Sequence, residues 1–175
     1  MDHADHVRLI SEGVAGGGPT WADLGSGAGA FTLGLADLLG PTGTIWSVDR
    51  DAPALREQAR ALGARFPGVT LRQLVADFTG HLDLPPMDGV VMANSLHFVR
   101  DKLPVLRLVR GCLRDGGRLV LVEYDADRGN PWVPYPLSFT TWRDLASASG
   151  FVDTRRLHAV PSRFLGSIYS AVSLR

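Results

Sequence analysis

The sequence predicts an α/β fold: a Rossmann-like, doubly wound and mostly parallel sheet with a C-terminal antiparallel strand pair. From Thr20 onward, short apolar runs alternate with amphipathic stretches of helical period, which indicates βαβ units. A glycine-rich turn, Gly25–Gly29, joins the first apolar run to the first helical stretch. The last two strand-like runs, 151–158 and 167–174, are joined by about eight residues and are typical of an antiparallel pair.

The first half of the chain is expected to hold three strands and two helices, after a helical N-terminal segment over residues 1–19. The strands are Thr20–Leu24, Thr44–Val48 and Val69–Val75. The first helix carries one apolar face from Phe31 to Leu39, and Gly40 ends it. Asp51 is placed to cap the second helix, whose end lies near Gly63.

The second half is expected to add four strands and two helices. The strands are Gly89–Ala93, Arg118–Tyr124, Phe151–His158 and Ser167–Leu174. Asp101 is placed to cap a helix that reaches Leu113, and the turn residues Asp115–Gly117 are expected to end it.

Residues 125–136 hold three prolines, so an ordered surface loop is expected there, of the kind that often carries function. Thr140 or Thr141 then opens a helix that ends near Gly150. Three aromatic residues of this region either line a substrate pocket or anchor the loop: Trp132, Tyr135 and Trp142.

Length and charge exclude several classes of protein. The chain has 175 residues, 45% of them hydrophobic, which suits one domain over residues 1–175. Lys+Arg and Asp+Glu both total 18, so the formal net charge is zero and no basic field attracts polyanions. A nucleic-acid binder is therefore disfavoured. The single cysteine, Cys112, excludes an internal disulfide and a multi-cysteine metal site, and no metal is expected.

The sequence shows no membrane span. The longest weakly charged apolar stretch, Gly89–Val99, has 11 residues, against the roughly 20 that a span needs. The first ten residues lack the basic and then apolar pattern of a secretory leader. We therefore expect a cytoplasmic protein.

The segment Asp23–Gly29 is the most informative part of the chain. Its three glycines at alternate positions let the backbone turn tightly and let a ligand approach the free amides of a helix N-terminus. Gly25, Gly27 and Ala30 also satisfy the dinucleotide pattern. Against a dinucleotide, the Asp23 carboxylate would repel a pyrophosphate but attract the ammonium of an amino-acid group. The terminal antiparallel pair is also foreign to the ordinary dinucleotide fold.

The order of motifs from about Thr20 to the C-terminus resembles that of class I S-adenosylmethionine-dependent methyltransferases. The motif Asp23–Gly29 resembles the family's first motif, whose acidic residue and glycine backbone hold the methionine part of the cofactor. Asp49 matches the acidic residue that binds both ribose hydroxyls, and Asp77-Phe78 resembles the pair beside the adenine. The cofactor-binding residues that the resemblance implies are Asp23, Gly25, Ser26, Gly27, Gly29, Asp49, Arg50, Asp77, Phe78 and Asn94.

Several positions carry further expectations. Arg50 stands where this family often has an apolar residue, so its guanidinium is expected to stack on the adenine instead. The segment Asn94–Phe98 is similar to the loop below the methyl donor in small-molecule enzymes of the quinone-biosynthesis type. His97 in that segment is a candidate general base, with a packing role as the alternative. Glu123 and Tyr124, at the end of the fifth strand, are either functional or structural.

The resemblance implies methyl transfer from S-adenosylmethionine to an O, N or C nucleophile of a small organic molecule, with S-adenosylhomocysteine as product. A protein side chain remains possible as acceptor. The acceptor side is closed by the N-terminal segment, the 125–136 loop or a second subunit, which leaves a homodimer open. The alternatives are an NAD-dependent oxidoreductase and a non-catalytic S-adenosylmethionine-binding protein.

Overall fold

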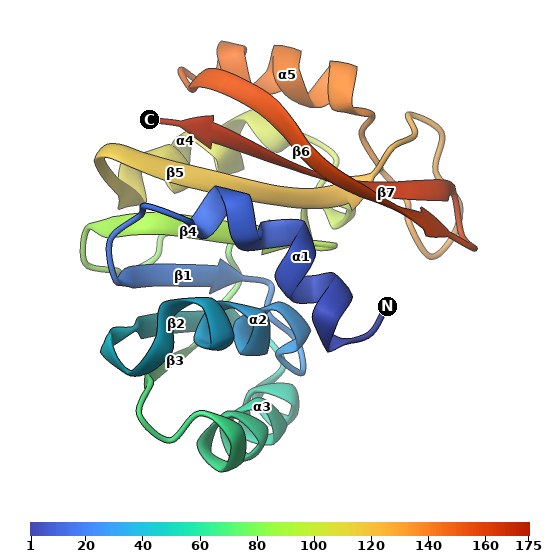
Figure 1. Ribbon diagram of the computed structural model, residues 1–175. Coiled ribbons are helices and arrows are strands. Elements are labelled where there is room, and N and C mark those ends of the chain that lie inside the picture. The colour runs from blue at the N-terminus through green and yellow to red at the C-terminus, as the bar shows by residue number, and fades with distance from the viewer.

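The computed structural model describes residues 1–175 and contains one seven-stranded sheet with helices on both faces (Figure 1). The strands are β1 (Thr20–Leu24), β2 (Thr44–Asp49), β3 (Thr70–Val75), β4 (Met87–Ala93), β5 (Leu113–Tyr124), β6 (Val152–Ser162) and β7 (Gly166–Leu174). The helices are α1 (His3–Val14), α2 (Ala30–Leu39), α3 (Ala52–Arg65), α4 (Lys102–Cys112) and α5 (Phe139–Ala148), with short 3-10 helices η1 (Gly40–Thr42) and η2 (Leu96–Phe98).

The strand order is β3-β2-β1-β4-β5-β7-β6, and β7 alone runs against the other strands. This confirms the predicted fold class, including the antiparallel pair at the C-terminus. Because β1 to β5 are parallel, their carboxyl ends meet at one edge of the sheet, where open α/β folds bind ligands.

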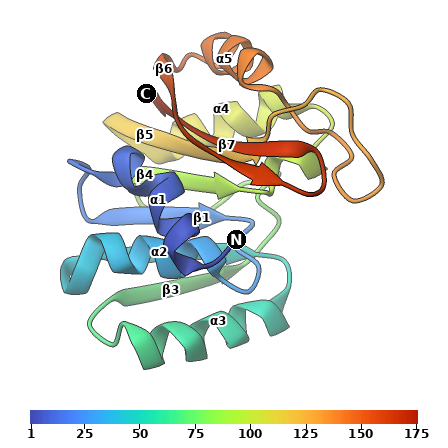
Figure 2. The ribbon, with the colours of Figure 1, turned by 45° about the vertical axis from the view of Figure 1, so that its right-hand side comes forward.

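Each face of the sheet carries its own hydrophobic core. Figure 2 shows α1, α2 and α3 on one face and α4 and α5 on the other. Alternate residues of a central strand serve the two cores: Val120 and Val122 of β5 pack with α1 and α2, whereas Leu119 and Leu121 pack with α4 and α5. Central strands buried on both faces explain the short unbroken apolar runs in the sequence.

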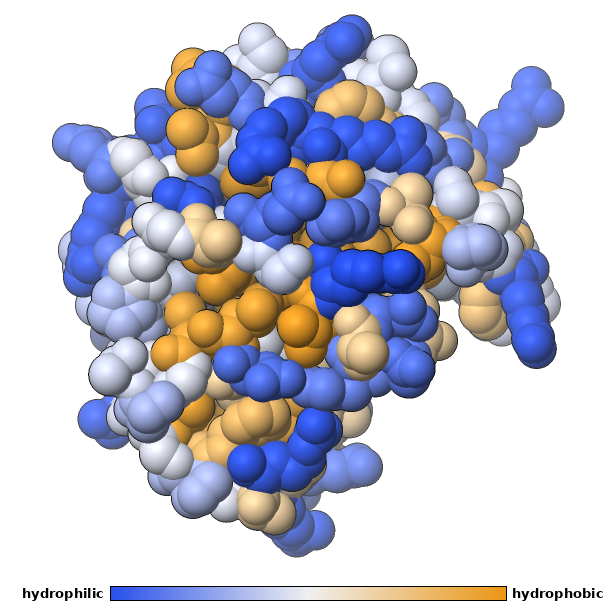
Figure 3. Space-filling view, viewed as in Figure 1, coloured by the Kyte–Doolittle hydropathy of each residue, from blue (hydrophilic) through white to orange (hydrophobic).

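The surface is mostly polar on the side where α1 lies. The space-filling view shows hydrophilic residues over most of this face, with hydrophobic ones gathered across its middle (Figure 3). None of the helices has the length and apolar composition that a membrane crossing requires.

The junction between α4 and β5 differs from the prediction. The helix ends at Cys112, and β5 starts at Leu113 rather than Arg118, so that the expected helix end Asp115–Gly117 lies inside the strand. The reason is that Leu113 is buried and pairs with Met87 of β4, which draws the chain into the sheet at once. The turn residues form an irregular insertion in the strand instead.

The C-terminal hairpin is longer than predicted. β6 reaches Ser162 and β7 begins at Gly166, so three residues join the strands instead of about eight. Pro161 lies within β6 and pairs with Ser167. A proline is tolerated there because β6 is an edge strand, so one side of its backbone needs no partner.

Three helix N-termini can be compared with the predicted caps and helix starts. Asp51 caps α3 through its side chain, as predicted. Asp101 stands at the N-cap of α4, but its side chain makes no capping hydrogen bond. The predicted start of α5 at Thr140 or Thr141 is wrong by one or two residues, because Ser138 caps that helix.

Gly89 of β4 supplies a test of the core. A Cβ at Gly89 would lie 2.4 Å from ring atoms of Trp21, which is fully buried and donates from Nε1 to the carbonyl of Gly18. We expect Gly89→Ala to lower the free energy of unfolding by roughly 1–3 kcal/mol, because the core becomes overpacked. Urea unfolding measures this. Gly63→Ala in α3, where a Cβ meets nothing, should raise stability by about 0.5–1 kcal/mol. Equal stability of the two variants would contradict this packing.

Candidate active site

A pocket of about 680 Å³ opens at the carboxyl ends of the parallel strands, within the size range of small-molecule sites. It is formed by the segments that follow β1, β2, β3 and β4. The lining residues are Gly25, Gly27, Asp49, Arg50, Asp51, Ala76, Asp77, Phe78, Thr79, Asn94, Ser95, Phe98 and Val99. Of the residues that the sequence suggested, seven line this pocket: Gly25, Gly27, Asp49, Arg50, Asp77, Phe78 and Asn94.

The three glycines of the turn have positive φ angles and separate roles. A Cβ at Gly25 would lie 2.5 Å from Cβ of Ser95, and one at Gly29 would lie 2.4 Å from Cγ of Gln58. These two glycines therefore let neighbouring side chains pack against the turn. Gly27 has no atom within 4 Å of where its Cβ would be. Its backbone faces the pocket, which is what close approach of a ligand requires.

Asp49 ties the end of β2 to the glycine turn. Its Oδ2 accepts from the N–H of Gly27 at 2.7 Å, and its Oδ1 accepts from the N–H of Asp51 at 2.8 Å. Two backbone donors thus hold the carboxylate at the wall of the pocket. Asp51, which the sequence suggested as a helix cap, also lines the pocket and is thus a second acid beside Asp49.

Asp77, Phe78 and Asn94 form the rest of the predicted wall. The N–H and Oγ1 of Thr79 both donate to Oδ1 of Asp77, and they hold the pKa of that carboxyl below its usual range. Phe78 is half-buried against the core. Asn94 has a φ of 52°, and its buried Oδ1 has no hydrogen-bond partner in the protein. An acceptor left free at a pocket wall suits a ligand that carries a donor.

Ser26 and Gly29 do not line the pocket but belong to the layer beneath it. Oγ of Ser47 donates to Oε1 of Gln58 at 2.7 Å, so the 2.7 Å contact between Ser26 and Ser47 has Ser26 as donor. Nε2 of Gln58 donates to Oγ1 of Thr32, also at 2.7 Å. This chain of side chains supports the turn from below, and its polar members Ser47, Gln58 and Thr32 were not singled out in the sequence.

Asp23 lies at the end of this series of hydrogen-bonded side chains. Oγ1 of Thr32 donates to its Oδ2 at 2.6 Å, and the carboxyl group is buried below the turn rather than on the pocket wall. Burial raises its pKa to about 7, and the nearby Asp49 adds to the rise while Thr32 opposes it. A carboxyl in this state gains most from a cation brought close to it.

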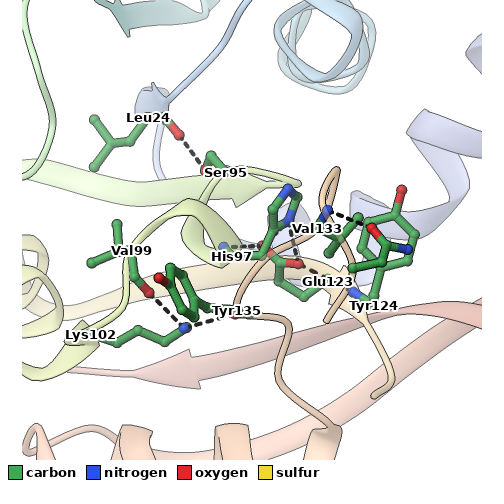
Figure 4. Close-up of polar contacts among 10 residues, drawn as sticks. Leu24, Ser95, His97, Val99, Lys102, Glu123, Tyr124, Val133 and Tyr135 are labelled. Atoms are coloured by element: carbon green, nitrogen blue, oxygen red, sulfur yellow. Dashed lines mark hydrogen bonds and ion pairs between the residues drawn. The ribbon is translucent and has the colours of Figure 1, made fainter. Parts of the chain in front are cut away.

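His97 lies at the same edge of the sheet, in η2, but does not line the pocket, whereas its neighbour Phe98 does. Its Nδ1 lies 2.9 Å from Oε2 and 3.1 Å from Oε1 of Glu123 (Figure 4). The N–H of His97 also donates to Oε1 of Glu123, at 3.0 Å. The two side chains are only 4% and 0% exposed. A carboxylate only accepts hydrogen bonds, so Nδ1 carries the hydrogen and Nε2 is left as the free basic nitrogen.

The sequence left the role of Glu123 open, and the structure places its carboxylate against His97. β4 and β5 are parallel neighbours, with Ala93 paired to Val122, so the residues that follow these positions must lie close together. This pairing was the available signal. Tyr124 packs its ring against His97, with ring centroids 5.7 Å apart.

The loop between β5 and α5, residues 125–138, is anchored next to His97. Val133 and Leu137 are buried in the two cores, and the N–H of Tyr135 donates to the carbonyl of His97 at 3.0 Å. No residue of this loop lines the pocket. Of the three aromatic residues noted above, Trp142 is fully buried in the core, whereas Trp132 is 70% exposed.

Comparison with known proteins gives this geometry a family. Residues 22–119, more than half of the chain, match the model of the methyltransferase domain family. A carboxy-S-adenosyl-L-methionine synthase of Psychrobacter sp. (strain PRwf-1) is 33% identical over 108 residues, which are 58% of this chain and 39% of the relative. The ubiquinone/menaquinone biosynthesis C-methyltransferase UbiE of Pasteurella multocida (strain Pm70) is 33% identical over 105 residues, 58% and 38% of the two chains. The chain thus spans about two fifths of the length of these relatives.

The fold agrees with a solved structure. The carbon methyltransferase DszA superimposes with a TM-score of 0.71 at 22% identity, over 91% of this chain and 48% of that chain. None of the matches named here is a nicotinamide enzyme, so the oxidoreductase alternative gains no support. The family match, the order of the motifs and the shared fold lead to one conclusion: the chain belongs to the methyltransferase domain family and has the motif order and fold of its class I S-adenosylmethionine-dependent members.

Proposed function

We propose that the chain transfers the methyl group of S-adenosylmethionine to a carbon or oxygen nucleophile of a small organic molecule, with His97 as general base. The observation that carries this proposal is the buried His97–Glu123 pair beside the pocket. The pair holds one ring nitrogen and leaves the other free, an arrangement that a proton acceptor needs.

The pocket suits the cofactor in size and in chemistry. In this proposal Asp49 accepts from the two ribose hydroxyls, since a carboxylate has acceptor capacity beyond its two backbone donors. Asp77 and Phe78 hold the adenine, and the exposed backbone of Gly27 and the buried Asp23 hold the methionine part. When bound, S-adenosylmethionine supplies an electrophilic methyl group on a sulfonium, which is itself a good leaving group.

The protein's own contribution is alignment and proton removal. Glu123 fixes the ring of His97 and its tautomer, and a nearby carboxylate stabilises the imidazolium that forms when Nε2 takes a proton. The ring of Phe98, which lines the pocket, lies 4.3 Å from the ring of His97, centroid to centroid. Holding nucleophile and methyl donor in line supplies much of the rate enhancement in a displacement of this kind.

The base defines the class of acceptor. Proton removal assists a nucleophile that carries a removable proton, such as an acidic C–H or a hydroxyl group, and brings nothing to a tertiary amine or a thioether. UbiE is named as a C-methyltransferase, which makes carbon acids the first acceptors to screen. Two exposed rings lie near His97: Phe98, 61% exposed, packs against it, and Phe164, 60% exposed, packs edge-on against its neighbour Tyr124. An apolar acceptor body fits this rim.

The ribose contact is tested with Asp49→Ala. We expect the variant to bind S-adenosylhomocysteine more weakly by roughly 1.5–3 kcal/mol, because charge-assisted hydrogen bonds are lost. Titration calorimetry measures the affinity, and the exposed Asp83→Ala, outside the pocket, is the matched control. An affinity within twofold of the wild type would remove Asp49 from the site.

The buried carboxyl of Asp23 makes the cofactor-free protein sensitive to pH. Its pKa is raised from 3.8 to about 7 on folding, so the folded chain keeps a proton that the unfolded chain releases, and stability is lost as the pH rises through this window. Asp23→Asn should therefore be more stable than the wild type at pH 8, by roughly 1–4 kcal/mol, and similar to it at pH 4. Urea unfolding at both pH values checks this, and a difference independent of pH would argue against it.

The role of His97 is tested once an acceptor is found by screening for release of S-adenosylhomocysteine. His97→Ala should lower kcat by roughly a hundredfold or more, leave cofactor affinity within twofold and erase the acidic limb of the pH–rate profile. Glu123→Gln should move that limb to lower pH, because the imidazolium loses its carboxylate partner. Wild-type kinetics for His97→Ala would return the residue to a packing role. Tight cofactor binding without turnover on any acceptor would favour the non-catalytic alternative.

A further inference from the structure

The single lysine of the chain occupies an unfavourable position for a cation. Of the 18 lysine and arginine residues, Lys102 alone is lysine. It is the first residue of α4 and only 7% exposed. Burial lowers the pKa of its amine, and the N-terminus of a helix carries partial positive charge of its own. A cation kept at such a position requires specific compensation.

That compensation comes from two backbone carbonyls. Nζ of Lys102 donates to the carbonyl of Val99 at 2.8 Å and to that of Tyr135 at 2.9 Å, and it lies 5.9 Å from the centroid of the Tyr135 ring (Figure 4). The N–H of Tyr135 donates in turn to the carbonyl of His97. Both backbone groups of Tyr135 are therefore bound to the His97 segment, residues 95–99, one directly and one through the lysine.

Hydrogen bonds therefore fix every polar group of His97 except one. Glu123 accepts from its N–H and from its Nδ1, and Tyr135 donates to its carbonyl, so Nε2 is the one polar group of His97 without a partner. Lys102 completes this frame because it fastens Tyr135 to Val99. The compact ammonium makes both of these bonds from one atom, whereas the larger planar guanidinium of arginine would need the two carbonyls in other positions.

The carboxylate of Glu123 also acts on Lys102 electrostatically, because its attraction opposes the lowering of the amine's pKa by burial. No ion pair joins the two side chains, so the two backbone carbonyls are the direct partners of the ammonium.

We propose that Lys102 is a positioning residue of the active site: its ammonium fastens the 125–138 loop to the His97 segment. The inference rests on the proposed function, because it assigns Lys102 to the support of a catalytic His97. Its fastening role is a property of the fold alone, so it is measurable without an acceptor.

The first experiment compares Lys102→Met with Arg107→Met, which removes an exposed, unpaired cation from the same helix. Hydrogen–deuterium exchange followed by mass spectrometry reports on residues 125–138. We expect the loop to exchange at least tenfold faster in Lys102→Met and at the wild-type rate in Arg107→Met. Equal exchange in the two variants overturns the fastening role, whether or not methyl transfer is ever observed.

The second experiment uses activity on an acceptor found by screening. Lys102→Met should lower kcat at least tenfold with the KM for S-adenosylmethionine within twofold. Arg107→Met should leave both constants within twofold of the wild type. A kcat within twofold of the wild type in Lys102→Met, with the loop exchanging faster, reduces Lys102 to a structural role and overturns its positioning role.

A third measurement covers the case in which Lys102→Met fails to fold. The wild-type protein labelled with ¹³C-lysine gives the signals of one side chain, because the chain has one lysine. We expect its amine to titrate below the ordinary lysine range and its ammonium protons to exchange slowly. A signal that behaves as that of an exposed lysine overturns the proposal.

Discussion

The parallel alignment of β1, β2, β4 and β5 is the constraint on which the site depends. It brings the ends of these strands to one edge, so residues far apart in the chain become neighbours without any long-range motif. Asp49 meets Gly27 because β2 lies beside β1, and Glu123 meets His97 because β5 lies beside β4. The antiparallel β7 covers the far side of β5 and buries Glu123, which makes the carboxylate a strong partner for an imidazolium.

The same alignment carries a cost in stability at the centre of the sheet. Asp23 is buried where an apolar residue would serve the core better. It accepts a hydrogen bond from Thr32, which is linked in turn to Gln58, Ser47 and Ser26. A fully connected chain of hydrogen bonds under the glycine turn is rigid. The carboxylate form of Asp23 at its end is stabilised only when a cation lies close to it. This is the pattern expected where stability is given up for binding.

The fold and the pocket at the strand ends were accessible from the sequence, because their signals are local. Apolar runs mark buried strands, and Gly25–Gly29 with Asp49 and Asp77 mark the ends of three strands. The errors lie where tertiary pairing overrides a local signal: Leu113 enters the sheet although Asp115–Gly117 reads as a helix end, and Pro161 remains in a strand because that strand is at the edge. The frame around His97 was harder to predict for the same reason. Glu123 and Tyr135 reach His97 from different elements, and Lys102 acts on this segment only through Val99 and Tyr135. The single lysine in an arginine-rich chain acquires a meaning only once its two carbonyl partners are known.

The two halves of the site differ in how they are built. The proposed cofactor side rests on backbone amides and carboxylates at strand ends, which the sheet itself holds in place. On the proposed acceptor side, the polar frame around His97 is made of loop backbone: the carbonyls of His97, Val99 and Tyr135. Carbonyls cannot hydrogen-bond to one another, so each of them needs a donor. The N–H of Tyr135 serves the carbonyl of His97, and the ammonium of Lys102 joins those of Val99 and Tyr135. This explains why a buried cation persists at a helix N-terminus that disfavours it.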